Sequence, residues 1–163
     1  MAPSSTADAR TARPARRPVQ VIALLLGVVF LAVGVLGFVP GVTTHYADLR
    51  FAGPDSGAQL LGVFAVSVLH NLVHLGYGVA GLVTARWAGA ARAFLVLGGG
   101  VYLLLWIYGV LVDRHSPANF VPLDSADNWL HLGLGLGMLA LGVAGTAVER
   151  AQRRYPPPEQ QGQ

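Results

Sequence analysis

Histidines and asparagines inside apolar runs are the residues of this sequence most able to do chemistry. An imidazole can bind a metal ion or haem iron and can carry a proton, and an asparagine amide both donates and accepts hydrogen bonds. Such side chains are costly in hydrocarbon, so their presence in a membrane-length run is a functional hypothesis by default. The candidates for a polar helix seam or a ligand set are Ser67, His70, Asn71, His74, Tyr77, Asn128 and His131.

The simplest interpretation of these residues is a polar seam between packed helices. Around 67–77, polar and small residues recur at spacings of three and four, which places them on one face of a helix. Small residues let membrane helices approach closely, and Ser, Asn and His hydrogen-bond across the interface with about 0.6–2 kcal/mol each. The matching stripe in the later run is Asn128, His131, Gly135, Met138, Gly142 and Gly145.

A second interpretation is haem, since imidazoles from two helices can ligate iron and four-helix bundles hold cofactors in their cores. Both helices are predicted to run inward, so depth can be counted from the arginines that follow. His74 lies 12 residues before Arg86 and His131 lies 19 before Arg150, a difference of about 10 Å at ~1.5 Å per residue. For His70 the mismatch with His131 is about 4–5 Å. A b-type haem would therefore favour His70 with His131, although the leading interpretation needs no cofactor.

A third interpretation is a proton-coupled or pH-sensing role. Burial favours neutral imidazole, whereas a nearby carboxylate favours the charged form. His131 follows Asp124 and Asp127, and His70 and His74 would continue such a path inward. The predicted spans contain no acidic residue of their own, which weakens a relay.

Metal binding and catalysis have less support. His70 and His74 stand at i and i+4, yet the sequence between them lacks the glutamate of the zinc-protease motif. The absence of cysteine excludes disulfides, iron–sulfur ligation and covalent c-type haem. No Ser-His-Asp arrangement has supporting context, so the sequence favours a protein that is not an enzyme. Other candidate metal ligands lie in polar loops, whose ordinary interpretation is solvation: His45, Asp48, His115 and Asp124.

Composition and hydropathy place these residues in a membrane. Of 163 residues, 53% are hydrophobic and 12% are charged, about half the charge of a soluble domain. About 20 apolar residues cross a bilayer, and only helices or closed barrels can do so. The sequence predicts an all-α, integral membrane four-helix bundle with disordered tails at 1–18 and 149–163. Its domain, 19–148, has helices at about 19–39, 58–84, 92–112 and 128–148.

Helix boundaries and orientation follow from local signals. Asp55 or Ser56 is expected to cap the second helix, and Ser125 or Asp127 the fourth. Nine arginines lie in the two tails and the middle loop, against two in the other loops, which predicts that both termini are cytoplasmic. The net charge of +3 resides in the tails and indicates contact with anionic lipid, not nucleic acid.

The sequence also repeats itself. The tripeptide Phe-Val-Pro occurs at 38–40 and at 120–122, and the pattern Asn-x-x-His-Leu-Gly-x-Gly occurs at 71–78 and at 128–135. Two helices per unit would give two hairpins of the same orientation. The offsets differ, 82 residues for the first match and 57 for the second, so duplication of a two-helix hairpin and chance similarity both stay open.

Several stretches together carry a family resemblance. These stretches lie between Arg17 and Val148, the region that the resemblance covers: LGVVFLAVGVLGFVPG, DLRFAG, VSVLHNLVHLGYGVAGL, YLLLWIYGVLVD and NFVPLDSADNWLHLGLG. They resemble the bacterial membrane-protein family filed as domain of unknown function 4383. The resemblance implies a small four-helix protein of the plasma membrane of a high-GC bacterium, and it carries over no catalytic residue.

The functional expectation is therefore an uncharacterised multi-pass membrane protein with a structural or interaction role. Its expected partners are the lipid bilayer and either further copies of itself or another membrane protein. The alternatives are a b-type haem protein and a proton-coupled or pH-sensing protein.

Overall fold

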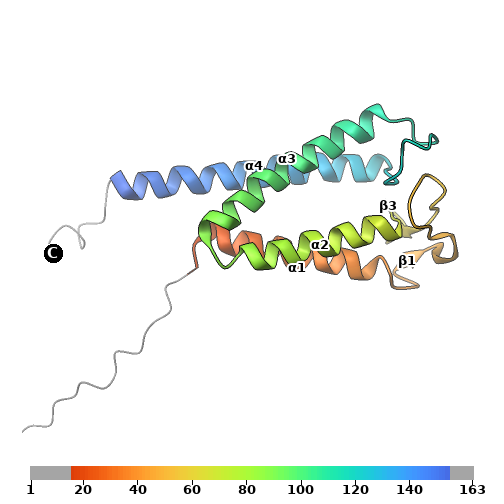
Figure 1. Ribbon diagram of the computed structural model, residues 1–163, viewed down its shortest axis with the longest axis horizontal. Helices are drawn as coiled ribbons and strands as arrows, with labels where there is room; N and C mark the ends of the chain where they lie inside the picture. The colour runs from red at the N-terminus through yellow and green to blue at the C-terminus, as the bar shows by residue number, and fades with distance from the viewer. Residues whose placement is uncertain (1–15, 155–163) are drawn as a thin grey trace, which may run out of the picture.

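The computed structural model describes residues 16–154 and forms four helices, as the sequence predicted (Figure 1). A three-stranded antiparallel sheet in the order β1-β2-β3 and a short 3-10 helix lie at one end. Residues 1–15 and 155–163, which contain most of the two predicted disordered tails, lie outside the described part. The elements are α1 (Pro18–Leu36), β1 (Thr43–Thr44), η1 (Tyr46–Asp48), β2 (Gln59–Leu60), β3 (Phe64–Ala65), α2 (Val68–Thr84), α3 (Ala88–Leu111) and α4 (Ser125–Arg154).

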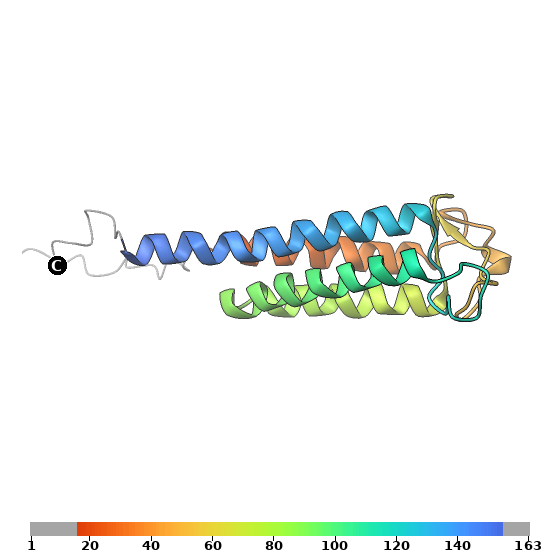
Figure 2. The same ribbon diagram turned by 90° about the horizontal axis from the view of Figure 1, so that it is seen from above.

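The helices form two antiparallel pairs. We call α1 with α2 the first hairpin and α3 with α4 the second hairpin. Contacts within each hairpin run along the helices, whereas contacts between the hairpins are fewer and are most numerous between α1 and α3. Figures 1 and 2 show the sheet and the long loops at one end of the molecule, and the ends of the described chain at the other. The architecture is thus two helical hairpins side by side.

Three of the helices are long and apolar enough to cross a membrane: Pro18–Leu36, Ala88–Leu111 and the Ser125–Gly145 part of α4. The fourth apolar helix, α2, has 17 residues and is shorter. Leucine and valine side chains are exposed on all of them, among them Leu25, Val79, Leu104 and Val143. Exposed branched apolar side chains around each helix are the surface expected of helices in lipid.

The predicted start of the second helix at Ala58 is wrong. Residues 59–65 instead form the paired strands β2 and β3, and α2 begins at Val68. The turn between the strands needs left-handed backbone at Leu61 (φ 55°) and Gly62 (φ 70°), which a helix cannot accommodate. An apolar run of this length does not by itself distinguish a helix from a buried strand pair. Non-helical backbone is tolerated there because it is covered by protein, with Ala58, Leu60 and Val66 buried together.

Other helix ends also differ from the prediction. The first helix ends at Leu36 rather than Val39, because Pro40 disfavours helical backbone in the residue before it. The third helix begins at Ala88 rather than Arg92, and the fourth extends to Arg154, into the predicted disordered tail.

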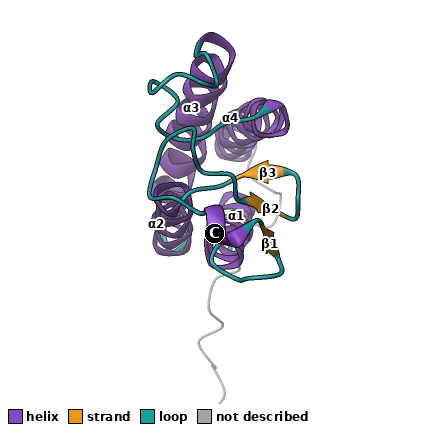
Figure 3. Cartoon of the chain, turned by 90° about the vertical axis from the view of Figure 1, so that its right-hand side faces the viewer, coloured by secondary structure: helices purple, strands orange, loops and turns teal. Residues whose placement is uncertain are grey.

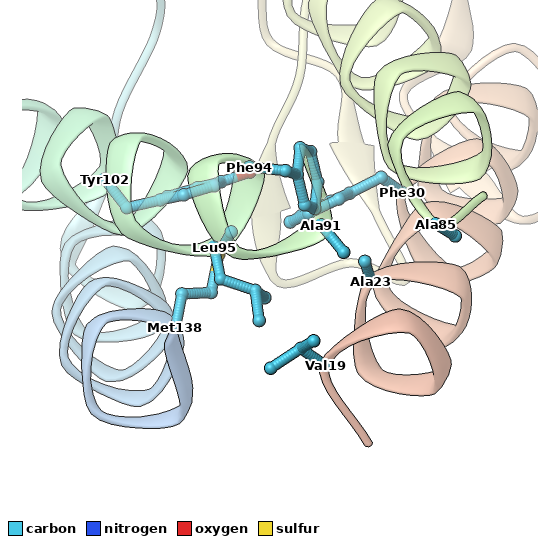
Figure 4. Packing of buried hydrophobic residues seen from close by; sticks show 9 residues of the cluster. All are labelled: Val19, Ala23, Phe30, Ala85, Ala91, Phe94, Leu95, Tyr102 and Met138. Carbon is cyan, nitrogen blue, oxygen red and sulfur yellow. The ribbon is translucent and has the colours of Figure 1, made fainter. Parts of the chain in front are cut away.

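The hydrophobic core lies between the hairpins. Phe30 from α1 and Leu95 and Tyr102 from α3 are almost completely buried there, and Met138 reaches them from α4 (Figure 4). Ala85, the residue that follows α2, is buried in the same cluster. Helices α1 and α3 therefore form the centre of the molecule.

Candidate functional site

The N-terminal end of α2 is fully hydrogen-bonded by its own chain. Ser67, not the predicted Asp55 or Ser56, is the cap, and its hydroxyl accepts from the His70 backbone N–H at 3.1 Å. The N–H groups of Val68 and Leu69 donate to carbonyls of the preceding loop, at Arg50 and Phe51. Because unsatisfied N–H groups are costly away from water, this loop enables α2 to begin in an apolar setting.

The two histidines of α2 each donate a hydrogen bond to a backbone carbonyl. His70 Nδ1 lies 2.9 Å from Ala65 O, and His74 Nδ1 lies 3.0 Å from His70 O. A carbonyl only accepts, so both rings carry their proton on Nδ1 when neutral, leaving Nε2 with a lone pair. The ring centroids are 4.4 Å apart. Backbone carbonyls thus fix the orientation of both histidine rings on one face of α2.

Each asparagine faces a glycine near the end of its partner helix. Asn128 Nδ2 donates to Gly109 O at 2.9 Å, and a Cβ at Gly109 would overlap the Asn128 side chain. In the first hairpin, a Cβ at Gly37 would overlap the Asn71 side chain in the same manner. Both amide atoms of Asn71 are buried without a hydrogen-bond partner, as is Asn128 Oδ1. The two sites share a geometry but differ in how well the amide is satisfied.

Four aromatic rings form a row between the hairpins. Phe30 and Tyr102 stack with centroids 5.6 Å apart and planes within 10° of parallel. His74 meets the edge of the Phe30 ring at 5.8 Å, and His131 lies 5.2 Å from the Tyr102 ring. We call His74, Phe30, Tyr102 and His131 the four-ring row. Tyr77 contacts both central rings, at 5.3 and 5.5 Å.

The contacts within the two hairpins match one another position by position. A Cβ at Gly27 would meet Gly78 O and Leu82 N, and a Cβ at Gly99 would meet Gly135 O and Leu139 N. The helices α1 and α3 correspond at an offset of 72 residues, and α2 and α4 at an offset of 57. Phe30 corresponds to Tyr102 and His74 to His131 at these offsets. The four-ring row is therefore symmetric, and equivalent residues meet at its centre.

This correspondence revises two sequence-based expectations. Counting from arginines predicted that His74 and His131 lie at different depths, whereas the structure places both beside the Phe30–Tyr102 stack. The count failed because α4 continues past Arg150 to Arg154, so Arg150 does not mark its end. The Phe-Val-Pro offset of 82 is not the offset that relates α1 to α3.

The equivalent of His70 in the second hairpin, at the offset of 57 residues, is Asp127. Asp124 caps α4 by accepting from the Asp127 N–H at 2.9 Å, and Asp127 Oδ2 accepts from the Asp124 N–H at 3.1 Å. The capping role thus falls on Asp124, with the predicted Asp127 as its reciprocal partner and Ser125 as the first helical residue. Asp127 Oδ2 also accepts from the Ala65 N–H at 3.1 Å. His70 therefore binds the carbonyl of Ala65, and Asp127 binds its N–H.

Most of the predicted polar residues gather in the interior: Ser67, His70, Asn71, His74, Asn128 and His131 are buried. Tyr77 is half-buried. Across residues 16–154, no three His, Asp or Glu side chains are placed to hold a metal ion, so the loop candidates do not form a metal centre.

Sequence reasoning missed Phe30, Tyr102 and Ala65. The first two could have been found, because Gly-x-Val-aromatic-Leu-x5-Gly occurs at 27–37 and again at 99–109. Ala65 carries no side-chain signal, since it takes part only through its backbone.

Comparison with known proteins identifies the family of the chain. The family model described as Domain of unknown function (DUF4383) matches residues 20–144. Neither the curated proteins nor the solved structures contain a match to the chain.

Proposed function

Because the chain belongs to the DUF4383 family, whose function is unknown, we propose a function from its own geometry: a structural or interaction protein of the membrane. Ser67, His70, His74 and Asn128 form their hydrogen bonds within their own hairpins. The plasma membrane of a bacterium, with both termini in the cytoplasm, is the proposed location.

The observation that carries this proposal is the direction of the polar hydrogen bonds. His70 and His74 donate to carbonyls of their own segment, and Asn128 donates to the end of α3. Ser67 is the helix cap of α2. A catalytic or transport site would need such groups to face a substrate path, whereas here they complete backbone hydrogen bonding that lipid cannot supply.

An interaction role also needs a surface for a partner within the membrane. Gly76 on α2 and Gly133 on α4 are equivalent positions, and at both a Cβ would meet nothing within 4 Å. Backbone open on that side allows close approach of a neighbouring helix. A second copy of the chain is the partner we propose to test first.

The test is chemical crosslinking of the purified protein in lipid nanodiscs and in membranes. Wild type is expected to give a crosslinked dimer, and Gly133→Leu to reduce it with no change in thermal stability. Gly89→Leu is the matched control, because Gly89 is also open but lies at the start of α3. A monomer in both settings, with no crosslink to any other membrane protein, would contradict the interaction role.

The haem alternative has a specific geometric difficulty. The space between His74 and His131 is filled by the stacked rings of Phe30 and Tyr102, so a macrocycle there would have to displace both. His70 is engaged at Ala65 O, although its Nε2 lone pair is free to ligate. An absorbance spectrum decides the matter: a Soret band that shifts on dithionite reduction and is lost in both His70→Ala and His131→Ala would establish the haem alternative.

A pH-sensing role is the second proposed function, and Asp127 is the observation that favours it. Its carboxylate is 2% exposed and accepts both of its hydrogen bonds at Oδ2 from backbone N–H groups. The test is the thermal stability of wild type, Asp127→Asn and His70→Ala between pH 5 and pH 9.5. Indistinguishable pH profiles would remove the histidine of α2 from any such role.

The proposed topology rests on the arginine count and on the placement of the chain ends away from the sheet (Figure 1). Reporter tags at the two termini test it. An extracytoplasmic C-terminus would contradict the proposal.

A further inference from the structure

The backbone of Ala65 is held from both sides by equivalent residues of the two hairpins. His70 Nδ1–H donates to Ala65 O at 2.9 Å, and Ala65 N–H donates to Asp127 Oδ2 at 3.1 Å. His70 is the third residue of α2 and Asp127 is the third residue of α4. One donor and one acceptor at equivalent positions thus match the two polar groups of a single residue.

Strand β3 is the part of the sheet that reaches the second hairpin. In Figure 3, viewed from the end that carries the sheet, β3 lies beside α4 and β1 lies on the side of α1. The sheet belongs to the first hairpin, because it lies in the loop that joins α1 to α2. The bond from Ala65 to Asp127 therefore ties the loop of the first hairpin to the first turn of α4.

Within residues 16–154, the donors to the Asp127 carboxylate are backbone N–H groups and not cationic side chains. On its own helix the nearest titratable groups are Asp124, which caps it, and His131, one turn further. From the first hairpin, His70 faces it across Ala65. From the loop after α3, Arg114 is directed to the Ser125 hydroxyl instead, at 2.9 Å.

Protonation would act on one side of Ala65 only. His70 keeps its Nδ1–H whether the imidazole is neutral or charged, so its bond to Ala65 O survives acid. Asp127 Oδ2 accepts two N–H groups as a carboxylate, whereas a carboxylic acid has a proton to donate and accepts more weakly. The acidic side chain is therefore the proton-sensitive half of the contact.

We propose that Asp127, Ala65 and His70 form an acid-released latch that fastens the outer sheet across the two hairpins. With Asp127 ionised, β3 is held against α4. With Asp127 protonated, β3 detaches from α4 while staying bonded to His70, and the two loops at this end stay joined by the Gly53 N–H, which donates to Phe120 O at 2.8 Å. The latch rests on the second proposed function, and it names the group that would sense pH.

Hydrogen exchange at the Ala65 amide reads the latch directly, because that N–H is the bond in question. The measurement uses NMR on the full chain in nanodiscs, with each rate divided by that of an unstructured peptide at the same pH. Wild type is expected to lose protection at Ala65 by about 10- to 100-fold between pH 9.5 and pH 5, the factor of a hydrogen bond to a charged group. Asp127→Asn should show weakened protection already at pH 9.5, with no further loss in acid.

Two comparisons keep the result interpretable. Asp124→Asn is the matched control, because asparagine also caps helices and the Asp127 carboxylate is left in place, so Ala65 should behave as in wild type. The Val66 amide, which donates to Ala58 O at 3.0 Å within the loop, should stay protected throughout. Unchanged Ala65 protection in wild type at pH 5 would overturn the latch, as would simultaneous loss at Val66, which signals unfolding of the sheet.

The latch and the function it serves can fail separately. If Ala65 exchange responds to pH but the thermal profiles of wild type and His70→Ala do not differ, the latch stands and the histidine is not the sensor. If Asp127→Asn does not fold, the wild-type comparison at two pH values still decides the proposal.

Discussion

The two hairpins share a framework and differ where each meets the loops at the end that carries the sheet. Both use a glycine against a facing backbone in mid-helix, Gly27 in one and Gly99 in the other. Both place an asparagine against a glycine and a histidine beside an aromatic ring. At the third residue of the second helix, however, the first hairpin has His70 and the second has Asp127. The shared glycines, asparagines and histidines pack the helices of each hairpin. The differing residues, His70 and Asp127, supply one hydrogen-bond donor and one acceptor.

That difference allows one residue in the loop of the first hairpin to hydrogen-bond with both hairpins. Two ionised aspartates at these positions would both accept, so they could bind the N–H but not the C=O of the same residue. A donor on one hairpin and an acceptor on the other can bind both groups. The difference at this single pair of equivalent positions thus lets the two similar hairpins bind the two polar groups of Ala65.

The largest expected effect comes from breaking the centre of the four-ring row. Phe30→Ala and Tyr102→Ala should each lower the free energy of unfolding by about 3–5 kcal/mol, the range for large aromatic residues removed from a packed core. The double variant should lose less than the sum, because the two rings contact each other. The measurement is unfolding in mixed micelles, with the 66% exposed Leu104→Ala as control. Full additivity would contradict a direct coupling of the hairpins through these rings.

Overpacking the glycine contacts should have an intermediate and equal effect on the two hairpins. In Gly27→Val or Gly99→Val, the new Cβ would lie 2.8–2.9 Å from a facing backbone nitrogen, which cannot move aside as a side chain can. A loss of about 1–3 kcal/mol is expected for each. Gly133→Val, with open space around it, should lose no stability and gain a few tenths of a kcal/mol, because valine has a higher helix propensity than glycine. Clearly unequal losses at Gly27 and Gly99 would break the equivalence of the hairpins.

The smallest effect should separate the two asparagines. Asn128→Ala removes a hydrogen bond to Gly109 O and should cost about 0.6–1.7 kcal/mol, the range for polar contacts between membrane helices. Asn71→Ala should cost less, because both of its amide atoms already lack a partner. Thermal unfolding of the two variants side by side is the measurement. A larger loss for Asn71 would mean that its amide is satisfied in the membrane by a group such as water.

Much of the fold could be predicted because its signals are local. Four apolar runs of near-membrane length predicted four helices, and spacings of three and four placed the polar residues on one face. The repeat of Asn-x-x-His predicted equivalent positions on two helices. These predictions hold because helix periodicity and backbone hydrogen bonding act over a few residues.

Other features were decided only by contacts between distant segments. Residues 58–67 are apolar enough for a helix, yet 59–60 and 64–65 form strands. In this conformation the loop accepts the first N–H groups of α2, and the Ala65 N–H donates to Asp127 Oδ2. The depth of His131 could not be counted from an arginine, because the length of α4 is not marked in the sequence.

The sequence by itself determined that the Asn and His residues of the apolar runs are buried, since polar side chains in a membrane-length run are costly in lipid and face the protein interior. Only the tertiary structure decided which of them meet. Helix register and the packing of α1 against α3 bring His74 and His131 to either side of one aromatic stack, and they bring His70 and Asp127 to opposite ends of Ala65. These are relations between hairpins, and no spacing along one chain segment encodes them.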